Sequence, residues 1–233
     1  MSKICIIPAR GGSKRIPRKN IKFFLGKPII AYSIKAALDS KLFDEVMVST
    51  DDKEIAEISR SYGAKTPFVR SKENANDFAS TVDVLIEVLD WYSKSGKNFD
   101  YCCCLYPAAP LASSELLIQN YNILLKEKCN VVFPIVAYSH PIQRAFKLKK
   151  NNRISLFFNL SESSRTQDLE VSYHDSGQFY WFETKNFLKN KNLFSENAIG
   201  VELSKLQVQD IDSLDDWEMA ELKFKKILSK NIL

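Results

Sequence analysis

The chain has 233 residues, of which 45% are hydrophobic and 26% charged, a composition typical of a globular domain. Its formal net charge is +5, but the 33 Lys and Arg residues are spread along the chain, so no nucleic acid partner is expected. A modest positive excess suits a small anionic substrate. No apolar stretch approaches the ~20 residues that cross a bilayer, and the N-terminus lacks an export signal. We therefore expect no membrane partner and a cytoplasmic location.

Short apolar runs alternate with amphipathic stretches over the first 136 residues. Strands are expected at residues 3–8, 45–49, 101–106 and 131–136, with a short extended piece at residues 66–69. Helices are expected at residues 28–38, 51–63, 80–92 and 114–126. This alternation predicts a three-layer α/β fold, with a mainly parallel, twisted sheet between two layers of helices.

The pattern changes after residue 136. Residues 145–156 are typical of a hairpin that turns at Asn151 and Asn152, and residues 161–172 are polar. Strands resume at residues 178–182 and 200–203, and a last helix is expected at residues 213–228. We interpret residues 1–233 as a single domain with an inserted arm at about residues 137–175.

The five cysteines lie in apolar runs and form no Cys-x-x-Cys pair. They are Cys5, Cys102, Cys103, Cys104 and Cys129. Neighbouring residues on a strand point to opposite faces, so the three consecutive cysteines are poorly arranged to hold a metal. We expect all five to pack in the core of a protein from a reducing compartment.

The first polar loop follows the expected strand at residues 3–8. Between positions 10 and 19 it carries five cations, namely Arg10, Lys14, Arg15, Arg18 and Lys19. Gly11 and Gly12 allow a tight turn whose N–H groups can converge on an anion. The loop matches neither the phosphate-binding Gly-x-x-x-x-Gly-Lys-Ser/Thr pattern nor a Gly-x-Gly-x-x-Gly turn. A triphosphate would offset the repulsion among the cations, and the alternative is a solvated basic turn.

Six segments, in order along the chain, resemble motifs of the CMP-sialic acid synthetase family of cytidylyltransferases. They are residues 8–20, 26–30, 48–51, 76–81, 164–168 and 209–212. The resemblance implies a sheet of the nucleotide-diphospho-sugar transferase type with an inserted dimerisation arm. It also implies transfer of a cytidylyl group from CTP to a nine-carbon keto-sugar acid.

The resemblance assigns the nucleotide to the first loop and to two later residues. The implied nucleotide-binding residues are Ala9, Arg10, Gly11, Gly12, Ser13, Lys14, Lys19, Asn20, Arg70 and Ser80. Arg70 and Ser80 match the family's cytosine readers, although Ser80 is equally suited to cap the helix that follows. The implied catalytic residues are Arg10, Lys19 and Asp212.

Asp210 and Asp212 flank Ile211 in what reads as a strand. Both carboxylates would then lie on one face, with Ile211 buried on the other. Paired carboxylates near a triphosphate suit Mg²⁺, which takes oxygen ligands and keeps several waters. We expect Mg²⁺ as the cofactor, held by Asp210 and Asp212; the alternative is that one of them caps the last helix.

The expected reaction is in-line attack by the anomeric hydroxyl of the sugar on the α-phosphate of CTP, with release of pyrophosphate. Such chemistry depends on positioning and on neutralisation of charge. The sequence does not identify a general base. Neither His140 nor His174 falls on a base position of the family, so we expect neither histidine to be catalytic.

By resemblance, the arm makes a homodimer and reaches the partner's sugar site. The implied sugar-binding residues are Tyr106, Pro107, Ala108, Arg144, Arg165, His174 and Gln178. Residues 106–110 read Tyr-Pro-Ala-Ala-Pro where the sialic acid enzymes have Gln-Pro-Thr-Ser-Pro, so the expected pocket is less polar.

A less polar pocket favours pseudaminic acid, which lacks the terminal hydroxyl of sialic acid. Residues 139–146 and 173–182 also resemble the pseudaminic acid branch. We therefore predict CTP and pseudaminic acid as substrates and CMP-pseudaminic acid and pyrophosphate as products, for a bacterial surface or flagellar glycan. The alternatives are synthesis of CMP-sialic or CMP-legionaminic acid, or a non-catalytic nucleotide-binding regulator.

Overall fold

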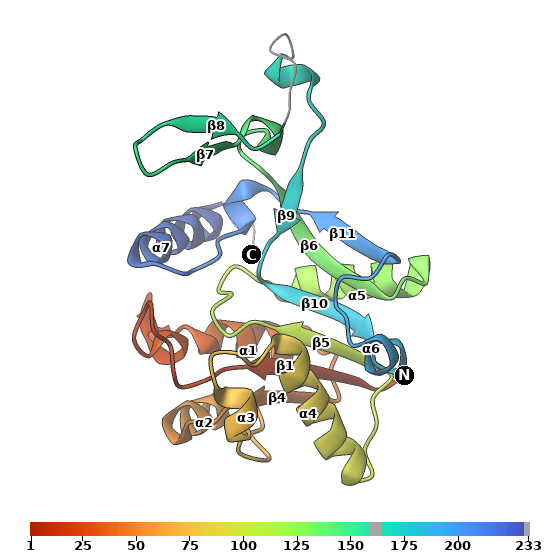
Figure 1. Cartoon of the computed structure of the whole chain (residues 1–233). Coiled ribbons are helices and arrows are strands. Elements are labelled where there is room, and N and C mark those ends of the chain that lie inside the picture. Colours follow the sequence, from red (N-terminus) through yellow and green to blue (C-terminus); the bar gives the residue numbers. More distant parts are fainter. Residues whose placement is uncertain (159–164, 231–233) are drawn as a thin grey trace.

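The computed structural model describes residues 1–158 and 165–230. Its central sheet has seven strands in the order β11-β6-β10-β5-β1-β4, with β9 paired to the outer part of β6 (Figure 1). These strands are β1 (Lys3–Pro8), β4 (Glu45–Ser49), β5 (Tyr101–Leu105), β6 (Val131–Ala137), β9 (Tyr173–Asp175), β10 (Phe179–Glu183) and β11 (Ala198–Glu202). Two small hairpins lie outside it: β2 (Phe23–Phe24) with β3 (Lys27–Pro28), and β7 (Phe146–Leu148) with β8 (Ile154–Leu156).

The sheet is mainly parallel, as predicted, with two strands reversed. β1 pairs parallel with β4 and β5, and β11 pairs parallel with β6. β10 lies antiparallel between β5 and β6, and β9 is antiparallel to β6. The reversal of β10 places its first residues at the edge of the sheet where β1 and β5 end.

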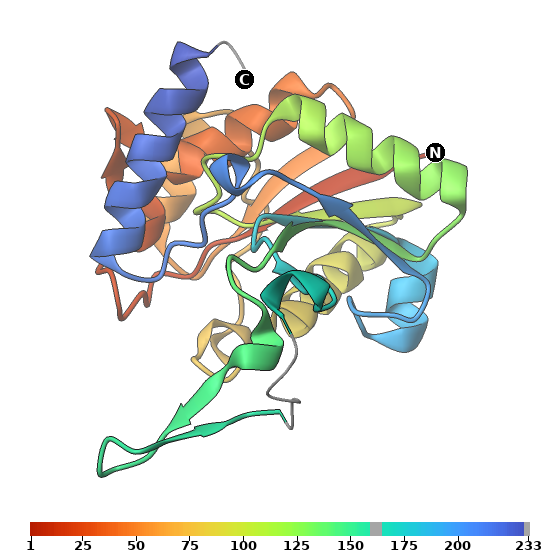
Figure 2. The ribbon, with the colours of Figure 1, turned by 90° about the horizontal axis from the view of Figure 1, so that it is seen from above.

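Helices cover both faces of the sheet (Figure 2). They are α1 (Ile30–Asp39), α2 (Lys53–Ser61), α3 (Lys72–Ala75), α4 (Thr81–Lys94), α5 (Ser114–Glu127), α6 (Thr184–Asn190) and α7 (Leu214–Ser229). α1 and α5 pack against the face that carries Cys5 and Ile7, whereas α4 and α6 pack against the face that carries Ile4 and Ile6. None of the described helices is long and apolar enough to span a membrane.

Both faces of β1 and β5 are buried, which explains why these strands read as continuous apolar runs. All five cysteines are free and buried, in agreement with the prediction from their sequence context. Burial raises the pKa of the Cys102 and Cys103 thiols well above the ordinary value. These thiols therefore behave as small apolar side chains.

α7 packs on the segment that follows the first loop. Phe24 is fully buried there, with its ring edge-to-face on Trp217 (5.7 Å between centroids) and on Phe224 (5.6 Å). Ile16 and Ile211 are buried in the same cluster. Because Ile211 belongs to this cluster, residues 210–212 lie next to the first loop although nearly 200 residues separate them in sequence.

Between β6 and β9 the chain leaves the sheet and forms the β7–β8 hairpin (Figure 1). The hairpin predicted at residues 145–156 is present, and Asn152 takes the left-handed conformation (φ 58°) at its turn. Its strands expose apolar side chains, among them Phe146, Leu148 and Ile154. The predicted polar stretch at residues 161–172 lies partly outside the described residues.

One local prediction is wrong: residues 209–212 are not a strand, although Ile211 is buried as expected. The short extended piece expected at residues 66–69 forms no strand, and Lys65 just before it makes an isolated bridge to Met47. The short elements α3, α6 and β9 were not foreseen. Each of these segments is too short for periodicity to decide.

The first loop is anchored at the N-terminus of α2. Gly11 N–H donates to Asp51 Oδ1 (2.9 Å), and Asp52 caps α2 by accepting from Ile55 N–H (3.0 Å). A Cβ atom on Gly11 would lie 2.9 Å from Asp52 Oδ2, whereas one on Gly12 would meet nothing within 4 Å. The first glycine is therefore required by packing and the second is not.

This difference gives a matched pair of variants. Gly11→Ala should lower the free energy of unfolding by about 1–3 kcal/mol because the new methyl displaces Asp52, whereas Gly12→Ala should change it by less than about 0.5 kcal/mol. Urea unfolding followed by circular dichroism measures both. Equal effects of the two substitutions would contradict the packing argument.

Candidate active site

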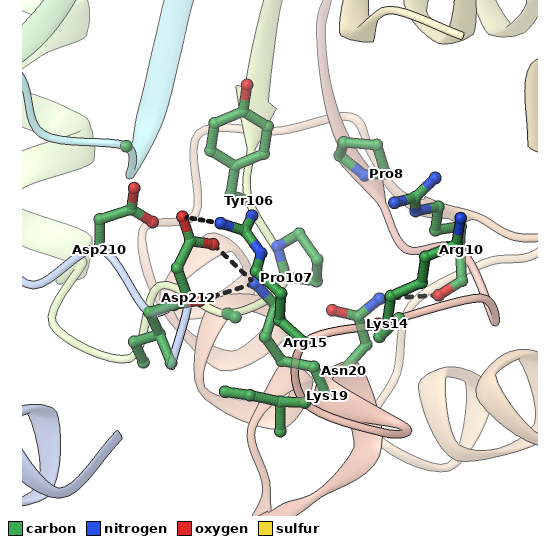
Figure 3. Close-up of a pocket in the computed structure, with 15 residues that line it drawn as sticks. Pro8, Arg10, Lys14, Arg15, Lys19, Asn20, Tyr106, Pro107, Asp210 and Asp212 are labelled. Atoms are coloured by element: carbon green, nitrogen blue, oxygen red, sulfur yellow. Dashed lines mark hydrogen bonds and ion pairs between the residues drawn. The ribbon is translucent and has the colours of Figure 1, made fainter. Parts of the chain in front are cut away.

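A cavity of about 410 Å³ lies at the carboxyl ends of β1 and β5, the edge where open α/β sheets bind ligands (Figure 3). Its lining residues are Pro8, Arg10, Ser13, Lys14, Arg15, Ile16, Lys19, Asn20, Tyr106, Pro107, Ala108, Gly177, Asp210, Ile211 and Asp212. The cavity thus joins the first loop, the segment after β5, the turn before β10 and the segment before α7.

Two cations of the first loop share one carboxylate. Arg10 Nη1 donates to Asp77 Oδ1 (2.9 Å), and the Lys14 ammonium binds the second oxygen of Asp77. Arg10 also donates to the Asn76 carbonyl (3.2 Å). The Lys14 ammonium, assisted by Arg10, lowers the pKa of Asp77. Both cations line the cavity, so Asp77 neutralises side chains that were predicted to bind phosphates.

Asp212 binds two further cations of the loop. Arg15 Nη1 lies 2.7 Å from Asp212 Oδ2, and Lys19 Nζ lies 3.7 Å from Asp212 Oδ1 (Figure 3). Lys19 also donates to the Ile211 carbonyl at 2.7 Å. These contacts tie the first loop to the segment before α7 and place Lys19 and Asp212, both predicted catalytic residues, side by side.

The fifth cation, Arg18, is turned away from the cavity. It takes a left-handed backbone conformation (φ 55°) and binds Asp52 and Glu54 at the start of α2. The hydrogen bond from Arg18 lowers the pKa of Asp52. All five loop cations therefore have protein carboxylates as partners. The repulsion among the five cations is thus offset by carboxylates of the protein itself.

Asp210 differs from Asp212 in that its carboxylate has no ion pair and no hydrogen bond from a side chain within the described residues, and is bonded only by the neighbouring Ile211 N–H (Figure 3). Desolvation, followed by the charge of Asp212, raises the pKa of Asp210. The alternative that Asp210 or Asp212 caps α7 is wrong, because Ser213 is the cap and Asp216 completes a capping box.

The two aspartates fit Mg²⁺, because they supply hard oxygen donors and Asp210 has unused lone pairs. No group of three or more His, Cys, Asp or Glu side chains that could hold a metal occurs in the described part of the chain. A magnesium ion here would therefore need substrate oxygens and water as further ligands, as is usual where it accompanies a nucleotide.

The remaining predicted nucleotide-binding residues are not all brought to the cavity. Ser13 and Asn20 line it, and Asn20 also donates to the Arg10 carbonyl (3.0 Å). Ala9 is fully buried, and Gly11 N–H is already engaged by Asp51. Gly12 does not line the cavity.

The two predicted cytosine readers have other contacts. Arg70 is 5% exposed and donates to Ser49 Oγ (3.0 Å) and to the Ser49 carbonyl. Burial lowers the pKa of Arg70 to about 10. Ser80 caps α4 in a capping box with Asp83, the alternative that the sequence left open. A role for Arg70 or Ser80 in reading cytosine remains a prediction.

The predicted sugar-binding residues fall into three places. Tyr106, Pro107 and Ala108 line the cavity. Gln178 is 1% exposed and donates to the Gln207 carbonyl (2.6 Å), so it joins two segments of the core.

The remaining three lie outside this cavity. His174 lines a neighbouring cavity, and Arg144 lies in the arm. Arg165, also in the arm, pairs with Asp168 at 2.8 Å. Within one chain, the structure does not gather these cations at one site.

Sequence reasoning missed the pairing of Asp77, the place of Gly177, and the contacts that Asp51 and Asp52 make with the first loop. Gly177 has φ +67°, a conformation that glycine adopts readily, and a Cβ there would touch the Asp210 carboxyl carbon at 3.4 Å. Asp77 lies within residues 76–81, one of the segments that resemble family motifs. A search for carboxylates that could neutralise the cations of the first loop would have pointed to Asp77.

The chain is similar to known proteins over nearly its whole length. The family model described as "Cytidylyltransferase" matches residues 4–227. The chain is 44% identical over 225 residues to a pseudaminic acid cytidylyltransferase of Campylobacter jejuni subsp. jejuni, covering 97% of each chain. It is 32% identical over 228 residues to a CMP-N,N'-diacetyllegionaminic acid synthase of Legionella pneumophila, covering 95% of each.

A solved structure of CMP:2-keto-3-deoxy-manno-octonic acid synthetase complexed with CTP has the same fold. The TM-score is 0.69 at 20% sequence identity, and the match covers 97% of this chain and 99% of that one. Because the family model spans nearly the whole chain and close relatives align end to end, the chain belongs to the cytidylyltransferase family of nucleotidyltransferases.

Proposed function

We propose that the protein transfers a cytidylyl group from CTP to pseudaminic acid, forming CMP-pseudaminic acid and pyrophosphate, with Mg²⁺ as cofactor. The observation that carries the proposal is the cavity that joins the cationic first loop to Asp210 and Asp212. The 44% identical relative supports pseudaminic acid as the acceptor. A cytoplasmic location is part of the proposal, since CTP is available there.

In this proposal the chain's own side chains position and neutralise the triphosphate. Arg10 and Lys14 bind its phosphates once they leave Asp77, and Arg10 stabilises the charge that develops on the α-phosphate during in-line attack. Lys19 holds Asp212 and faces the same cavity. Asp210 and Asp212 would hold Mg²⁺, which would neutralise phosphate charge and orient the leaving pyrophosphate. No general base is assigned.

Tyr106 is the main argument for a less polar sugar site. Its hydroxyl pairs with Thr81 Oγ1 (3.2 Å), and its ring lies edge-to-face on Tyr180 (5.9 Å). With its hydroxyl paired to Thr81, Tyr106 presents the cavity with more apolar surface than a glutamine would. A site with few polar groups loses little when the acceptor lacks a hydroxyl. The legionaminic acid relative keeps that acid as the second candidate acceptor.

We also propose a homodimer in which the arm reaches the partner's sugar site. The exposed apolar side chains of the β7–β8 hairpin support it, because apolar surface of this kind is usually covered. Arg144 and Arg165, which do not line their own chain's cavity, would then serve the partner. Sedimentation of the purified protein as a monomer at micromolar concentration would exclude this arrangement. A non-catalytic regulator is not supported, since the relatives are enzymes.

The function is tested by supplying CTP, Mg²⁺ and one acid at a time. We expect pyrophosphate and the CMP-sugar to form fastest with pseudaminic acid, at a kcat/KM at least about tenfold above legionaminic and sialic acids, as the loss of one well-used hydroxyl contact allows. Mass spectrometry of the nucleotide sugar identifies the product. A sialic acid rate equal to or above the pseudaminic rate would overturn the choice of acceptor.

Asp77 gives a second prediction. Removing its charge leaves Arg10 and Lys14 without their carboxylate, so Asp77→Asn should bind CTP about two- to fivefold more tightly at low salt, the range of an exposed ion pair. The gain should shrink as salt is added. Isothermal titration with CTP alone measures it.

The control is Asp90→Asn, which removes an exposed ion pair with Lys94 on the surface of α4. It should leave CTP affinity unchanged. Weaker CTP binding by Asp77→Asn would show instead that Asp77 orients the two cations while the nucleotide is bound.

A further inference from the structure

Asp175 is the last residue of β9, where the chain returns from the arm to the sheet. It lies opposite Ile135 of β6 and does not line the active-site cavity. Both oxygens of its carboxylate have partners. One accepts a hydrogen bond from the Tyr180 hydroxyl, and the other accepts one from the Gly177 N–H (2.9 Å). Each of these two partners leads to a different wall of the cavity.

The first oxygen of Asp175 holds a buried tyrosine. Tyr180, on β10, is 3% exposed, and its ring lies edge-to-face on Tyr106 at 5.9 Å between centroids. The Tyr180 ring also packs on Phe133 (5.4 Å) and Phe194 (5.8 Å). With the hydroxyl bound by Asp175 and the ring enclosed on these sides, Tyr180 has one position, and it supports the ring of Tyr106 from behind.

Neither phenol is suited to move a proton in the reaction. Burial is the main cause that raises the pKa of Tyr106 to about 12, and the charge of Asp175 contributes to the same shift. Burial, followed by the neighbouring Tyr106 and Asp175, also raises the pKa of Tyr180. Both side chains therefore stay neutral at neutral pH. Their contribution to the site is shape.

The second oxygen of Asp175 holds the turn between β9 and β10. The Gly177 N–H donates to it from two residues further along, the pattern by which aspartate and asparagine close turns. A Cβ atom on Gly177 would lie 3.4 Å from the Asp210 carboxyl carbon. The backbone of Gly177 therefore packs directly on the Asp210 carboxylate and limits where that carboxylate can lie.

Tyr106 and Asp210 both line the active-site cavity (Figure 3). We propose that Asp175, from outside the cavity, is a positioning residue for both of them. It fixes the ring of Tyr106 through Tyr180, and it fixes the carboxylate of Asp210 through Gly177. The inference rests on the proposed function, in which Tyr106 shapes the sugar site and Asp210 would hold Mg²⁺. The alternative is that Asp175 only ends β9.

Three variants separate the two contacts of Asp175. Tyr180→Phe removes one hydroxyl and keeps the ring, so it breaks only the contact that leads to Tyr106. Asp175→Ala breaks both contacts. Asp175→Asn keeps an oxygen for the Gly177 N–H, because asparagine closes the same kind of turn, so it should preserve the contact that leads to Asp210.

Two control variants make the same chemical changes elsewhere. Tyr173→Phe matches Tyr180→Phe, because the Tyr173 hydroxyl also donates to a carboxylate, that of Glu202 (3.2 Å), and Tyr173 does not line the active-site cavity. Asp39→Ala matches Asp175→Ala, because it removes an exposed carboxylate that is paired with Lys35 on α1.

Steady-state rates with CTP, Mg²⁺ and pseudaminic acid measure the contact that leads to Tyr106. We expect kcat/KM for the acid to fall about five- to tenfold in Tyr180→Phe, mainly through a higher KM for the acid, because a ring without support shapes the site less well. The Kd for CTP, measured without the acid, should stay within about twofold of the native value, since the bound acid is the ligand that contacts Tyr106.

Isothermal titration with CTP, with and without Mg²⁺, measures the contact that leads to Asp210 and needs no turnover. We expect the gain in CTP affinity on addition of Mg²⁺ to shrink at least about threefold in Asp175→Ala, because residues that orient a metal ligand contribute to metal affinity. The gain should remain native in Tyr180→Phe and in Asp175→Asn. Both control variants should match the native protein in every measurement.

Native kinetics and a native Mg²⁺ gain in Asp175→Ala would overturn the inference and leave the proposed function intact. A lower unfolding temperature as the only change would also overturn it, because Asp175 would then only end β9. A native KM for the acid in Tyr180→Phe would overturn it even if Asp175→Ala failed to fold. If the native protein turned over no keto-sugar acid, the proposed function itself would fail, and the role of Asp175 would fail with it.

Discussion

Five cations within ten residues of the first loop repel one another, and the site depends on how that repulsion is offset. Arg18 is paired at the start of α2, Arg10 and Lys14 share Asp77, and Arg15 and Lys19 share Asp212. The pairing of Arg18 with Asp52 lies outside the cavity and stabilises the fold, because Asp52 packs against Gly11. The other two face the cavity. They hold the loop against the cavity, and in the proposed function the phosphates of CTP would replace these carboxylates as partners of the cations.

The placement of Asp212 depends in turn on apolar packing. Ile211 is buried with Phe24 and Trp217, so the cluster under α7 fixes residues 210–212 against the loop. The same segment separates two cavities, one lined by the loop cations and the other by Lys205 and Lys223. In the proposed function this segment would hold Mg²⁺ between the loop cations and the transferred phosphate.

Much of the fold could be predicted from the sequence where an element depends only on neighbouring residues. The strand Lys3–Pro8 and the capped helix after Asp52 follow from apolar periodicity and from the chemistry of helix ends. The sequence did not predict the reversed direction of β10 or the pairing of Asp77 with Arg10, because both depend on contacts between segments distant in sequence. Resemblance identified the loop and the aspartate pair, but it could not show that Ser80 already caps a helix. Side-chain partners had to come from the structure.

The most direct test of the account is the turnover of Asp212→Ala against Asp215→Ala, an exposed neighbour that lines neither cavity. Pyrophosphate release is measured with CTP, Mg²⁺ and pseudaminic acid, together with the unfolding temperature of each variant. The account predicts that Asp212→Ala lowers kcat by at least about 100-fold with little change in unfolding temperature, while Asp215→Ala behaves as the native protein. Near-native turnover by Asp212→Ala would contradict it, because the loop cations and the metal would then act without the carboxylate on which this site is built.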